Sequence, residues 1–468
     1  MTQWADQPKS STQRSGYGFP RGSEFFGATE RFNRYYTDAS YQPSRTIYVS
    51  PGGGGNGTSA DSPTSVSTGF SQIRAGQQLT FLASNTAYEG CWELDEDKSG
   101  TYDAPIVIYG ERNADGSRGV TIDCCNTGRK SCFNLEAAHH VAIDGFIMRG
   151  GRYGIRTVGA GYAPSDNQVG IAIIDNEGAG QCGDPFFSGQ SSWIVVHGNV
   201  AHGAGECDGH GIYLSNGGDY MLVKGNETYD NESSDFQVNA DPISTCDDEG
   251  IAYSDPRCDG TVTEGLGQGV SEFLLIEDNY FHHGTGPGPN LTSVRSSIVR
   301  NNIIGPYARH GTSFWQETDN PKLGSQKNLV HHNLFMGNGS RHILQFINGS
   351  GQNDVRNNLI IAIGNAPVLL ESDTSSNTMK GNFYVGRQRF DGYTPNSSER
   401  SADTLDPSWF QSFPVAMRES AQGFRPTSHA PFTRWGQLIP ATPSDRGGRQ
   451  RAEATSLGPY EMATPQKR

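Results

Sequence analysis

Residues 219–239, DYMLVKGNETYDNESSDFQVN, decide the fold. They hold two short apolar runs, a step from Gly225 to Asn226, and a polar turn between the runs. Short apolar runs bounded by turn residues are typical of β-strands. Much of the chain repeats this unit, so we interpret it as one rung of a ladder and expect function on the outer surface of the stacked rungs.

The unit recurs from about residue 119 onward. Its asparagines are spaced 23, 27, 53, 23, 31, 25 and 24 residues apart, and the 53-residue interval holds about two periods plus an excursion from Cys246 to Cys258. A period in the low to mid twenties, with short strands and no helix between them, predicts a parallel β-solenoid. The recurring asparagines are Asn176, Asn199, Asn226, Asn279, Asn302, Asn333, Asn358 and Asn382.

An asparagine at the same turn of every coil has a physical reason. Successive coils lie about 4.8 Å apart, so an inward side-chain amide can bond both to local backbone and to the next coil. These bonds satisfy polar groups that the turn would otherwise bury without partners.

Composition also fits a repeat protein. Of 468 residues only 34% are hydrophobic while 60 are glycine, and repeats need less core because each buries its inner face on its neighbours. The net charge of −14 disfavours a nucleic-acid partner, and neither a basic run nor an apolar stretch of about 20 residues suggests membrane binding. The start, MTQWADQPKSS, is not a secretory signal, so either a signal was removed or release occurs another way.

The eight cysteines include no CxxC pair, which disfavours a structural zinc site. An even count in an acidic, glycine-rich chain favours disulfides in an oxidising compartment. We expect Cys246 and Cys258 to close the acidic excursion between them. This excursion is rich in carboxylates that suit Ca²⁺, although a solvated loop is the simpler interpretation and the spacing is not that of an EF-hand.

The flanking segments have a different character. Residues 1–45 show neither helical nor strand periodicity and read as an arm on the main body, and residues 391–468 read as a tail that packs on or caps the open end. Strands are expected at 46–50, 78–84, 104–110 and 119–123, and a short helix at 71–75. The glycine-rich loop after residue 50 lacks a phosphate-binding pattern.

Two motifs carry a resemblance to a known family. The opening YVSPGGGGNGTSADSP (48–63) and the ending FRPTSHAP…LGPYE (424–461) resemble those of right-handed parallel β-helix proteins of the pectin-lyase-like superfamily. The resemblance implies an all-β chain, with a single right-handed parallel β-helix of roughly ten coils at 46–390. It does not fix the reaction, because this class includes lyases, hydrolases, epimerases and phage tailspikes.

Each coil also carries a later strand with alternating side chains. Alternation places Ile212 and Leu214, Phe236 and Val238, Thr312 and Phe314, Leu344 and Phe346, and Val368 and Leu370 inward. It places outward Arg156, Tyr213, Gln237, Trp315, Gln345 and Leu369. Aromatic faces stack on sugar rings and amides bind hydroxyls, so this stripe predicts a carbohydrate platform.

A second set of side chains lies at the heads of these strands: His210, Asp235, His310, Arg341 and His342, with Arg295 just after its own strand. A histidine can act as base near neutral pH, and an arginine can neutralise a carboxylate. These are the groups that β-elimination from a uronate needs. We therefore predict a secreted lyase of an acidic polysaccharide, with His210 as base, Tyr213 as acid, Arg295 or His310 as neutraliser, and Asp235 orienting a histidine or binding a cation.

A charged row precedes the ladder asparagines: His197, Lys224, Glu277, Arg300, His331, Arg356 and Lys380. Pairing between rungs is the preferred interpretation, with Lys224 and Arg300 kept as substrate-binding reserves. Resemblance to alginate and chondroitin lyases of this superfamily would imply a lysine base, an arginine and calcium, but their motifs are not matched.

Three alternatives stay open. A glycoside hydrolase would use two carboxylates, with Asp184, Asp208 and Asp235 as candidates, the last two preferred. A C5-epimerase would share the base and the neutraliser. A non-catalytic or phage-type spike would bind carbohydrate without cleaving it.

Overall fold

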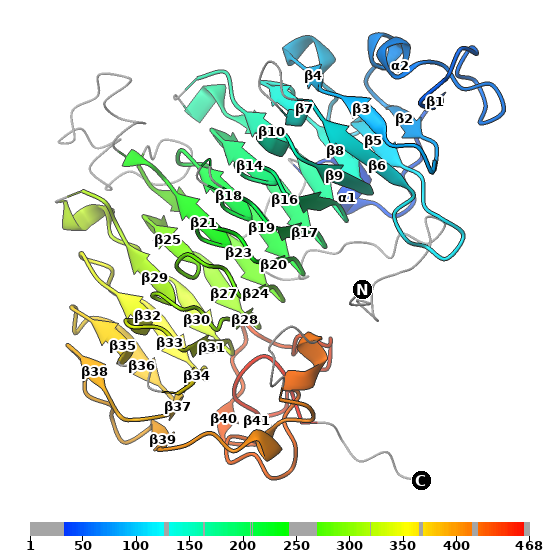
Figure 1. Cartoon of the computed structure of the whole chain (residues 1–468). Helices are drawn as coiled ribbons and strands as arrows, with labels where there is room; N and C mark the ends of the chain where they lie inside the picture. Colours follow the sequence, from blue (N-terminus) through cyan, green and yellow to red (C-terminus); the bar gives the residue numbers. More distant parts are fainter. Residues whose placement is uncertain are drawn as a thin grey trace.

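A computed structural model describes residues 32–125, 131–161, 164–205, 207, 209–242, 269–318, 320–364, 368–413 and 420–462. The chain winds into a single stack of coils, and each coil adds one strand in turn to three long parallel sheets, A, B and C (Figure 1). The predicted right-handed parallel β-helix is confirmed.

Sheet A has twelve strands: β1 (Arg45–Val49), β2 (Gln77–Phe81), β5 (Ile106–Gly110), β8 (Val141–Asp144), β12 (Ala172–Ile174), β16 (Ile194–His197), β19 (Met221–Lys224), β23 (Leu275–Glu277), β27 (Ile298–Arg300), β30 (Leu329–His331), β33 (Asp354–Arg356) and β36 (Thr378–Lys380). Sheet B also has twelve: β3 (Tyr88–Gly90), β6 (Val120–Cys124), β9 (Phe146–Arg149), β13 (Glu177–Ala179), β17 (Val200–His202), β20 (Glu227–Tyr229), β24 (Tyr280–His282), β28 (Ile303–Ile304), β31 (Leu334–Gly337), β34 (Leu359–Ala362), β37 (Phe383–Val385) and β39 (Arg400–Ala402).

Sheet C has eleven: β4 (Trp92–Leu94), β7 (Ser131–Glu136), β10 (Tyr153–Val158), β14 (Phe186–Gly189), β18 (Ile212–Ser215), β21 (Phe236–Asn239), β25 (Asn290–Thr292), β29 (Thr312–Trp315), β32 (His342–Phe346), β35 (Val368–Ser372) and β38 (Phe390–Asp391). Short pairs outside these sheets are β11 (Gln168–Val169) with β15 (Ser191–Ser192), β22 (Ser271–Glu272) with β26 (Val294–Arg295), and β40 (Gly436–Gln437) with β41 (Ala454–Thr455).

The helices are short. Helix α2 spans Val66–Gln72, and its N-cap Ser65 accepts from the backbone N–H of Thr68. The predicted helix at 71–75 therefore overlaps α2 but starts too late, because the capping serine was not recognised. A second α-helix, α1, has four residues (Arg34–Thr37). The described 3₁₀ turns are Glu96–Lys98, Pro164–Asp166, Pro321–Leu323, Pro407–Trp409 and Ala421–Phe424.

The eight predicted asparagines form one continuous ladder at the turn from sheet A to sheet B. Asn226 Oδ1 accepts from the backbone N–H of Asn199 at 2.9 Å and from its Nδ2 at 3.0 Å. Asn226 Nδ2 donates in turn to the Val196 carbonyl at 2.8 Å and to Asn279 Oδ1 at 3.0 Å. All eight asparagines are fully buried, so this repeated bond pattern replaces the water that the turn has lost.

The residue before each ladder asparagine has a left-handed backbone conformation, which lets the chain turn within one residue. Glycine, asparagine and aspartate tolerate this conformation best, and they hold all but one of the positions. The eight residues are Asp175, Gly198, Gly225, Asp278, Asn301, His332, Asn357 and Gly381.

A second ladder, not predicted from the sequence, lies at the turn from sheet C to sheet A. Asn328 Oδ1 accepts from the backbone N–H of Ser297, and Asn328 Nδ2 donates to Asn353 Oδ1 at 3.0 Å. Asn353 Nδ2 donates to Asn377 Oδ1 at 3.0 Å. This ladder spans only the last coils, which is why it gives no long-range period.

Inward side chains stack between coils to form the main core. Phe236 stacks on Phe281 with ring centroids 5.0 Å apart, and Phe314 stacks on Phe346 at 4.8 Å. The inward predictions for sheet C are confirmed, except that Val368 is only half-buried.

Strict alternation fails at the heads of the sheet C strands. Two consecutive residues are buried there: Asp235 with Phe236, Ile343 with Leu344, and Leu369 with Leu370. The prediction that Leu369 faces solvent is therefore wrong, because it lies in the main core. Asp235, expected beside the histidines on the surface, has 0% of its surface exposed.

The described part of the N-terminal arm lies across the outer face of sheet A. It contains helix α1 (Arg34–Thr37), a four-residue turn too short to show helical periodicity. Tyr35 donates to Asp144 Oδ2 at 2.5 Å, and Tyr36 Oη lies 3.1 Å from His197 Nδ1. Its aromatic residues pack on strands of sheet A, so the arm covers an apolar face that would otherwise meet water.

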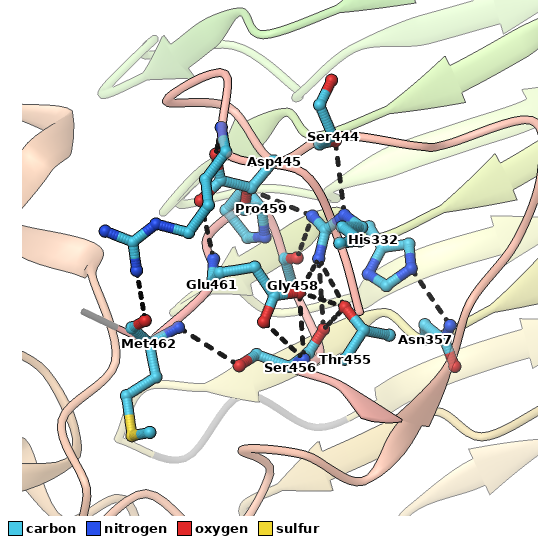
Figure 2. A network of polar contacts seen from close by, with 12 residues as sticks. His332, Asn357, Ser444, Asp445, Thr455, Ser456, Gly458, Pro459, Glu461 and Met462 are labelled. Carbon is cyan, nitrogen blue, oxygen red and sulfur yellow. Dashed lines mark hydrogen bonds and ion pairs between the residues drawn. The ribbon is translucent and has the colours of Figure 1, made fainter. Parts of the chain in front are cut away.

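The C-terminal tail packs on the outer face of sheet B through Phe410, Phe424, Phe432 and Tyr460. A buried arginine, Arg451, joins the tail to itself and to the coils. It donates to Asn301 Oδ1 at 2.9 Å and pairs with Glu461 at 2.9 Å. Figure 2 shows the surrounding polar network, in which the Asn357 side chain donates to His332 at 3.1 Å.

Three disulfides link neighbouring segments: Cys91–Cys125, Cys124–Cys132 and Cys182–Cys207. The first two hold the early coils, and the third joins two loops that precede strands of sheet C. The predicted Cys246–Cys258 link lies outside the described residues.

Candidate functional site

The outer face of sheet C carries one continuous row of side chains in register. Tyr213 pairs with Gln237, Gln237 with Asn290, Asn290 with Ser313, Ser313 with Gln345, and Gln345 with Glu371. We call these six residues the platform row.

Contacts along the platform row hold its side chains in place. Asn290 Nδ2 donates to Gln237 Oε1 at 3.2 Å, and Trp315 Nε1 donates to Asn290 Oδ1 at 2.5 Å. At the other end of the row, the rings of Phe187 and Tyr213 pack edge to face, with their centroids 5.4 Å apart. The row thus presents aromatic faces and amides in a fixed order, which suits an extended chain of hydroxylated rings.

The first cluster at the heads of these strands is the His210 cluster: Asp184, His210, Tyr213 and Ser233. His210 Nδ1 lies 3.1 Å from Asp184 Oδ1, which also accepts from the His210 backbone N–H at 2.9 Å. His210 Nε2 lies 3.1 Å from Ser233 Oγ. The Tyr213 ring lies 4.7 Å from the imidazole, and burial raises the pKa of this phenol.

The second is the His310 cluster: His310, Arg341, His342, Ser313 and Glu371. His342 Nε2 lies 3.1 Å from Ser313 Oγ, and its Nδ1 lies 3.2 Å from Glu371 Oε2. Burial, with help from His310 and Arg341, lowers the pKa of His342 to about 3, so this ring is neutral at pH 7. Because a carboxylate only accepts, we assign the ring proton to Nδ1.

His310 is the accessible imidazole of this cluster. It is half-buried and stacks on His342 with ring centroids 5.4 Å apart. Burial and the nearby Arg341 and Arg309 lower its pKa below the ordinary value. Arg341 and Arg309 are themselves exposed, so a neutral base stands beside two solvent-facing cations.

The two clusters do not meet. Three coil steps separate Tyr213 from Ser313, which corresponds to roughly 14 Å at about 4.8 Å per step. Arg295, predicted as a neutraliser for His210, lies in β26 at the turn from sheet C to sheet A and is largely buried. The structure therefore separates residues that the sequence analysis placed in one site.

Asp235 has a structural environment. Its carboxylate accepts from Asn231 Nδ2 at 2.6 Å and from Tyr307 Oη at 2.9 Å. Complete burial raises its pKa to about 7. A carboxylate inside the coil cannot flank a sugar bond on the surface, and Asp208, its partner in the hydrolase interpretation, lies outside the described residues.

Lys224 and Arg300 lie on sheet A, away from the platform row. Both bind Glu277: Lys224 Nζ at 2.7 Å and Arg300 Nη2 at 2.6 Å. Burial alone would raise the pKa of Glu277, but the two cations bring it down to about 2. The charged row runs in register along sheet A, as the pairing interpretation predicts.

Ser233, Ser313 and Glu371 are not among the residues predicted from the sequence, and Asp184 is predicted only as a hydrolase carboxylate. A usable signal existed, because Asp184 and His210 are 26 residues apart, about one coil. Across the described ranges, no three His, Cys, Asp or Glu side chains are grouped as a metal ion would require. The carboxylates of the predicted calcium excursion lie beyond those ranges.

Comparisons with known proteins agree with this architecture. A family profile described as a right handed beta helix region matches residues 263–384. A pectate lyase, Pel9A, shares 14% identity over 91% of this chain and 98% of its own, with a TM-score of 0.52. The chain has the right-handed parallel β-helix fold.

Two further β-helix structures align along most of their length. A rhamnogalacturonan lyase has 12% identity, covers 81% of this chain and 94% of its own, and gives a TM-score of 0.50. The structure of XylC in complex with xylose has 8% identity, covers 90% of this chain and 98% of its own, and gives a TM-score of 0.51. No curated protein matches the sequence. Within the described part of this β-helix, no helix is long and apolar enough to cross a membrane.

Proposed function

We propose that the protein is a carbohydrate-active enzyme that cleaves a uronate-containing polysaccharide by β-elimination at the His310 cluster. The observation that carries this proposal is the half-buried His310 beside the exposed Arg341 and Arg309, at the edge of the platform row. β-Elimination needs a neutral base and a positive charge for the adjacent carboxylate, and this cluster offers both.

In this scheme Arg341 and Arg309 offset the uronate carboxylate, which makes the C5 proton more acidic. His310 removes that proton, and the electron pair forms the C4–C5 double bond as the C4–O bond breaks. The leaving oxygen takes a proton from the imidazolium when both groups lie on one face of the ring. Each step balances without a cofactor.

The base is assigned to His310 instead of the predicted His210 because of their surroundings. The described contacts of His210 are Asp184, Ser233 and Tyr213, and none of these is a cation. His342, held by Ser313 and Glu371, positions the His310 ring by stacking on it. Asp235, Arg295, Lys224 and Arg300 are given no part in the reaction.

Substrate binding is assigned to the platform row and its neighbours. Trp315 offers an aromatic face to a sugar ring, and the half-buried Gln237 offers an amide to hydroxyl groups. Gln345, predicted beside them, is only 6% exposed and is given no contact with substrate. The likeness to a pectate lyase and a rhamnogalacturonan lyase supports a polysaccharide substrate. The disulfides support a secreted, extracellular protein, and the net charge gives no reason to expect a nucleic-acid partner.

The test is incubation with a panel of uronate-containing and neutral polysaccharides, following both absorbance at roughly 235 nm from the unsaturated product and reducing ends. We expect both signals to rise together on a uronate polymer. Reducing ends without absorbance would instead support a hydrolase. Deuterium exchange at C5 without cleavage would support an epimerase, and binding without any change would support a spike. Parallel assays with EDTA and with added calcium test the metal alternative.

A further inference from the structure

The His210 cluster has hydrogen bonds in the order carboxylate, imidazole, hydroxyl, and the β-elimination proposal does not use it. Asp184 and His210 are almost completely buried, whereas Ser233 is only half-buried. Asp184 lies before β14, His210 before β18, and Ser233 before β21, so three successive coils contribute one group each. We propose that Ser233, His210 and Asp184 form a serine-hydrolase site that removes acyl groups from a polysaccharide hydroxyl.

The direction of each bond follows from the chemistry of the acceptors. Asp184 Oδ1 accepts from both the backbone N–H and the Nδ1–H of His210, so the ring proton is assigned to Nδ1. The lone pair of Nε2 then faces Ser233 Oγ at 3.1 Å, and the hydroxyl donates to it. This is the tautomer that a histidine needs to accept a proton from a serine nucleophile.

The serine lies in a turn whose backbone is fixed. The Ser233 N–H donates to the Gly209 carbonyl at 3.0 Å, and the Gly211 N–H donates to the Ser234 carbonyl. In this scheme the backbone N–H of Ser234, the residue after the nucleophile, would receive the negative oxygen of a tetrahedral intermediate.

The surroundings fit an acyl group on a sugar. Tyr213 lies against the imidazole and Phe187 lies against Tyr213, so a half-buried aromatic wall flanks His210. The same tyrosine begins the platform row, so the assignment of a sugar as the carrier of the acyl group rests on the proposed carbohydrate substrate. Ser313 also bonds a histidine, but it is only 8% exposed and its histidine stacks on His310.

The proposed reaction passes through an acyl-serine. Ser233 Oγ forms a bond to the acyl carbonyl carbon as its proton moves to His210 Nε2. The bond from the acyl carbon to the sugar oxygen then breaks, and the released hydroxyl takes the proton from His210. Water, deprotonated by His210, attacks the acyl-serine and releases a carboxylic acid, which restores the Ser233 hydroxyl.

The test uses the full chain with two probes: a fluorophosphonate, read by intact mass, and p-nitrophenyl acetate. We expect one phosphonyl group on Ser233 and none in Ser233→Ala, with ester hydrolysis falling by about 10³-fold or more in Ser233→Ala and His210→Ala. Ser67→Ala, an exposed serine on α2, is the matched control and keeps both signals. Labelling or hydrolysis unchanged in Ser233→Ala overturns the assignment.

A second variant guards against loss of folding. Ser233→Cys places a thiol beside the same imidazole, so iodoacetamide should alkylate it at least tenfold faster than the same cysteine in a His210→Ala background. Equal rates would contradict the proposal. His310→Ala separates the two activities, because it should lose β-elimination and keep ester hydrolysis, whereas Ser233→Ala should show the reverse.

Discussion

His310 lies flat against His342, with ring centroids 5.4 Å apart and planes inclined by 22°. The inner ring is fixed by Ser313 and Glu371, so the outer ring rests on a support that cannot rotate freely. This relationship makes His310 the testable centre of the elimination proposal.

His310→Ala removes the proposed base. We expect kcat for β-elimination to fall by about 10²- to 10⁴-fold, the usual contribution of a positioned acid–base group. Initial rates of absorbance change on the preferred polymer measure it. His429→Ala, an exposed histidine of the tail, is the control and should retain the rate. A His310→Ala enzyme with full activity would remove His310 from the mechanism.

Arg341→Ala tests the charge beside the base. Because Arg341 lowers the pKa of His310, its removal should move the acidic limb of the kcat/KM profile to higher pH, as well as slow the reaction. The profile is measured between pH 4 and 9 for wild type, Arg341→Ala and Arg341→Lys. The lysine variant should keep the limb near its wild-type position, and Arg387→Ala, an exposed arginine elsewhere, should change nothing. A limb that stays in place in Arg341→Ala contradicts the electrostatic role.

Trp315→Ala tests the platform. Loss of a stacking face worth about 1–1.5 kcal/mol should raise KM by roughly tenfold and leave kcat nearly unchanged. Trp315→Phe keeps an aromatic face but loses the hydrogen bond to Asn290, so its KM should lie between that of the wild type and that of Trp315→Ala. If KM is unchanged in both variants, sugar does not stack on this residue.

Asn226→Ala tests the ladder. It leaves the Asn199 N–H and the Val196 carbonyl without their partners in a dry interior, so the free energy of unfolding should fall by about 3 kcal/mol or more. Urea unfolding followed by circular dichroism measures it. Asn85→Ala, an exposed asparagine outside the ladder, should change stability by about 0.5 kcal/mol or less. Equal losses in the two variants would show that the ladder contributes little.

Asp235 makes stability depend on pH. Its pKa is about 7 in the folded protein, above its ordinary value, so the folded state binds the proton more tightly than the unfolded state. The free energy of unfolding should therefore fall as pH rises from about 4 to about 7. Asp235→Asn should flatten this fall, whereas the exposed Asp123→Asn should not. Part of the slope should persist, because burial and Glu277 raise the pKa of Asp278 to about 6. An unchanged slope in Asp235→Asn refutes this origin.

The fold could be predicted because an asparagine makes the same hydrogen bonds at the same turn of successive coils. A buried asparagine at each turn from sheet A to sheet B leaves a period in the sequence that varying loop lengths do not erase. The second ladder, through Asn328, Asn353 and Asn377, covers too few coils to do the same.

The site could be predicted only in part. Sequence patterns identified His210, His310 and His342 at the heads of the strands, but not their partners. The reason is local, since two consecutive inward residues break the alternation at Asp235–Phe236 and at Leu369–Leu370. Beyond that break, the alternation of inward and outward residues no longer predicts which side chains face the solvent. Intervals between coils also vary, so the meeting of Ser233 with His210 is visible only in three dimensions.

The arm across sheet A has a consequence for the order in which the molecule can be completed. Tyr36 is synthesised 161 residues before His197, the side chain that it contacts. During synthesis the arm gains these contacts in steps: Tyr35 meets Asp144 once the fourth strand of sheet A has been added, and Tyr36 meets His197 only with the sixth. The arm therefore completes its contacts only after six strands of sheet A have formed, although it precedes all of them in the sequence.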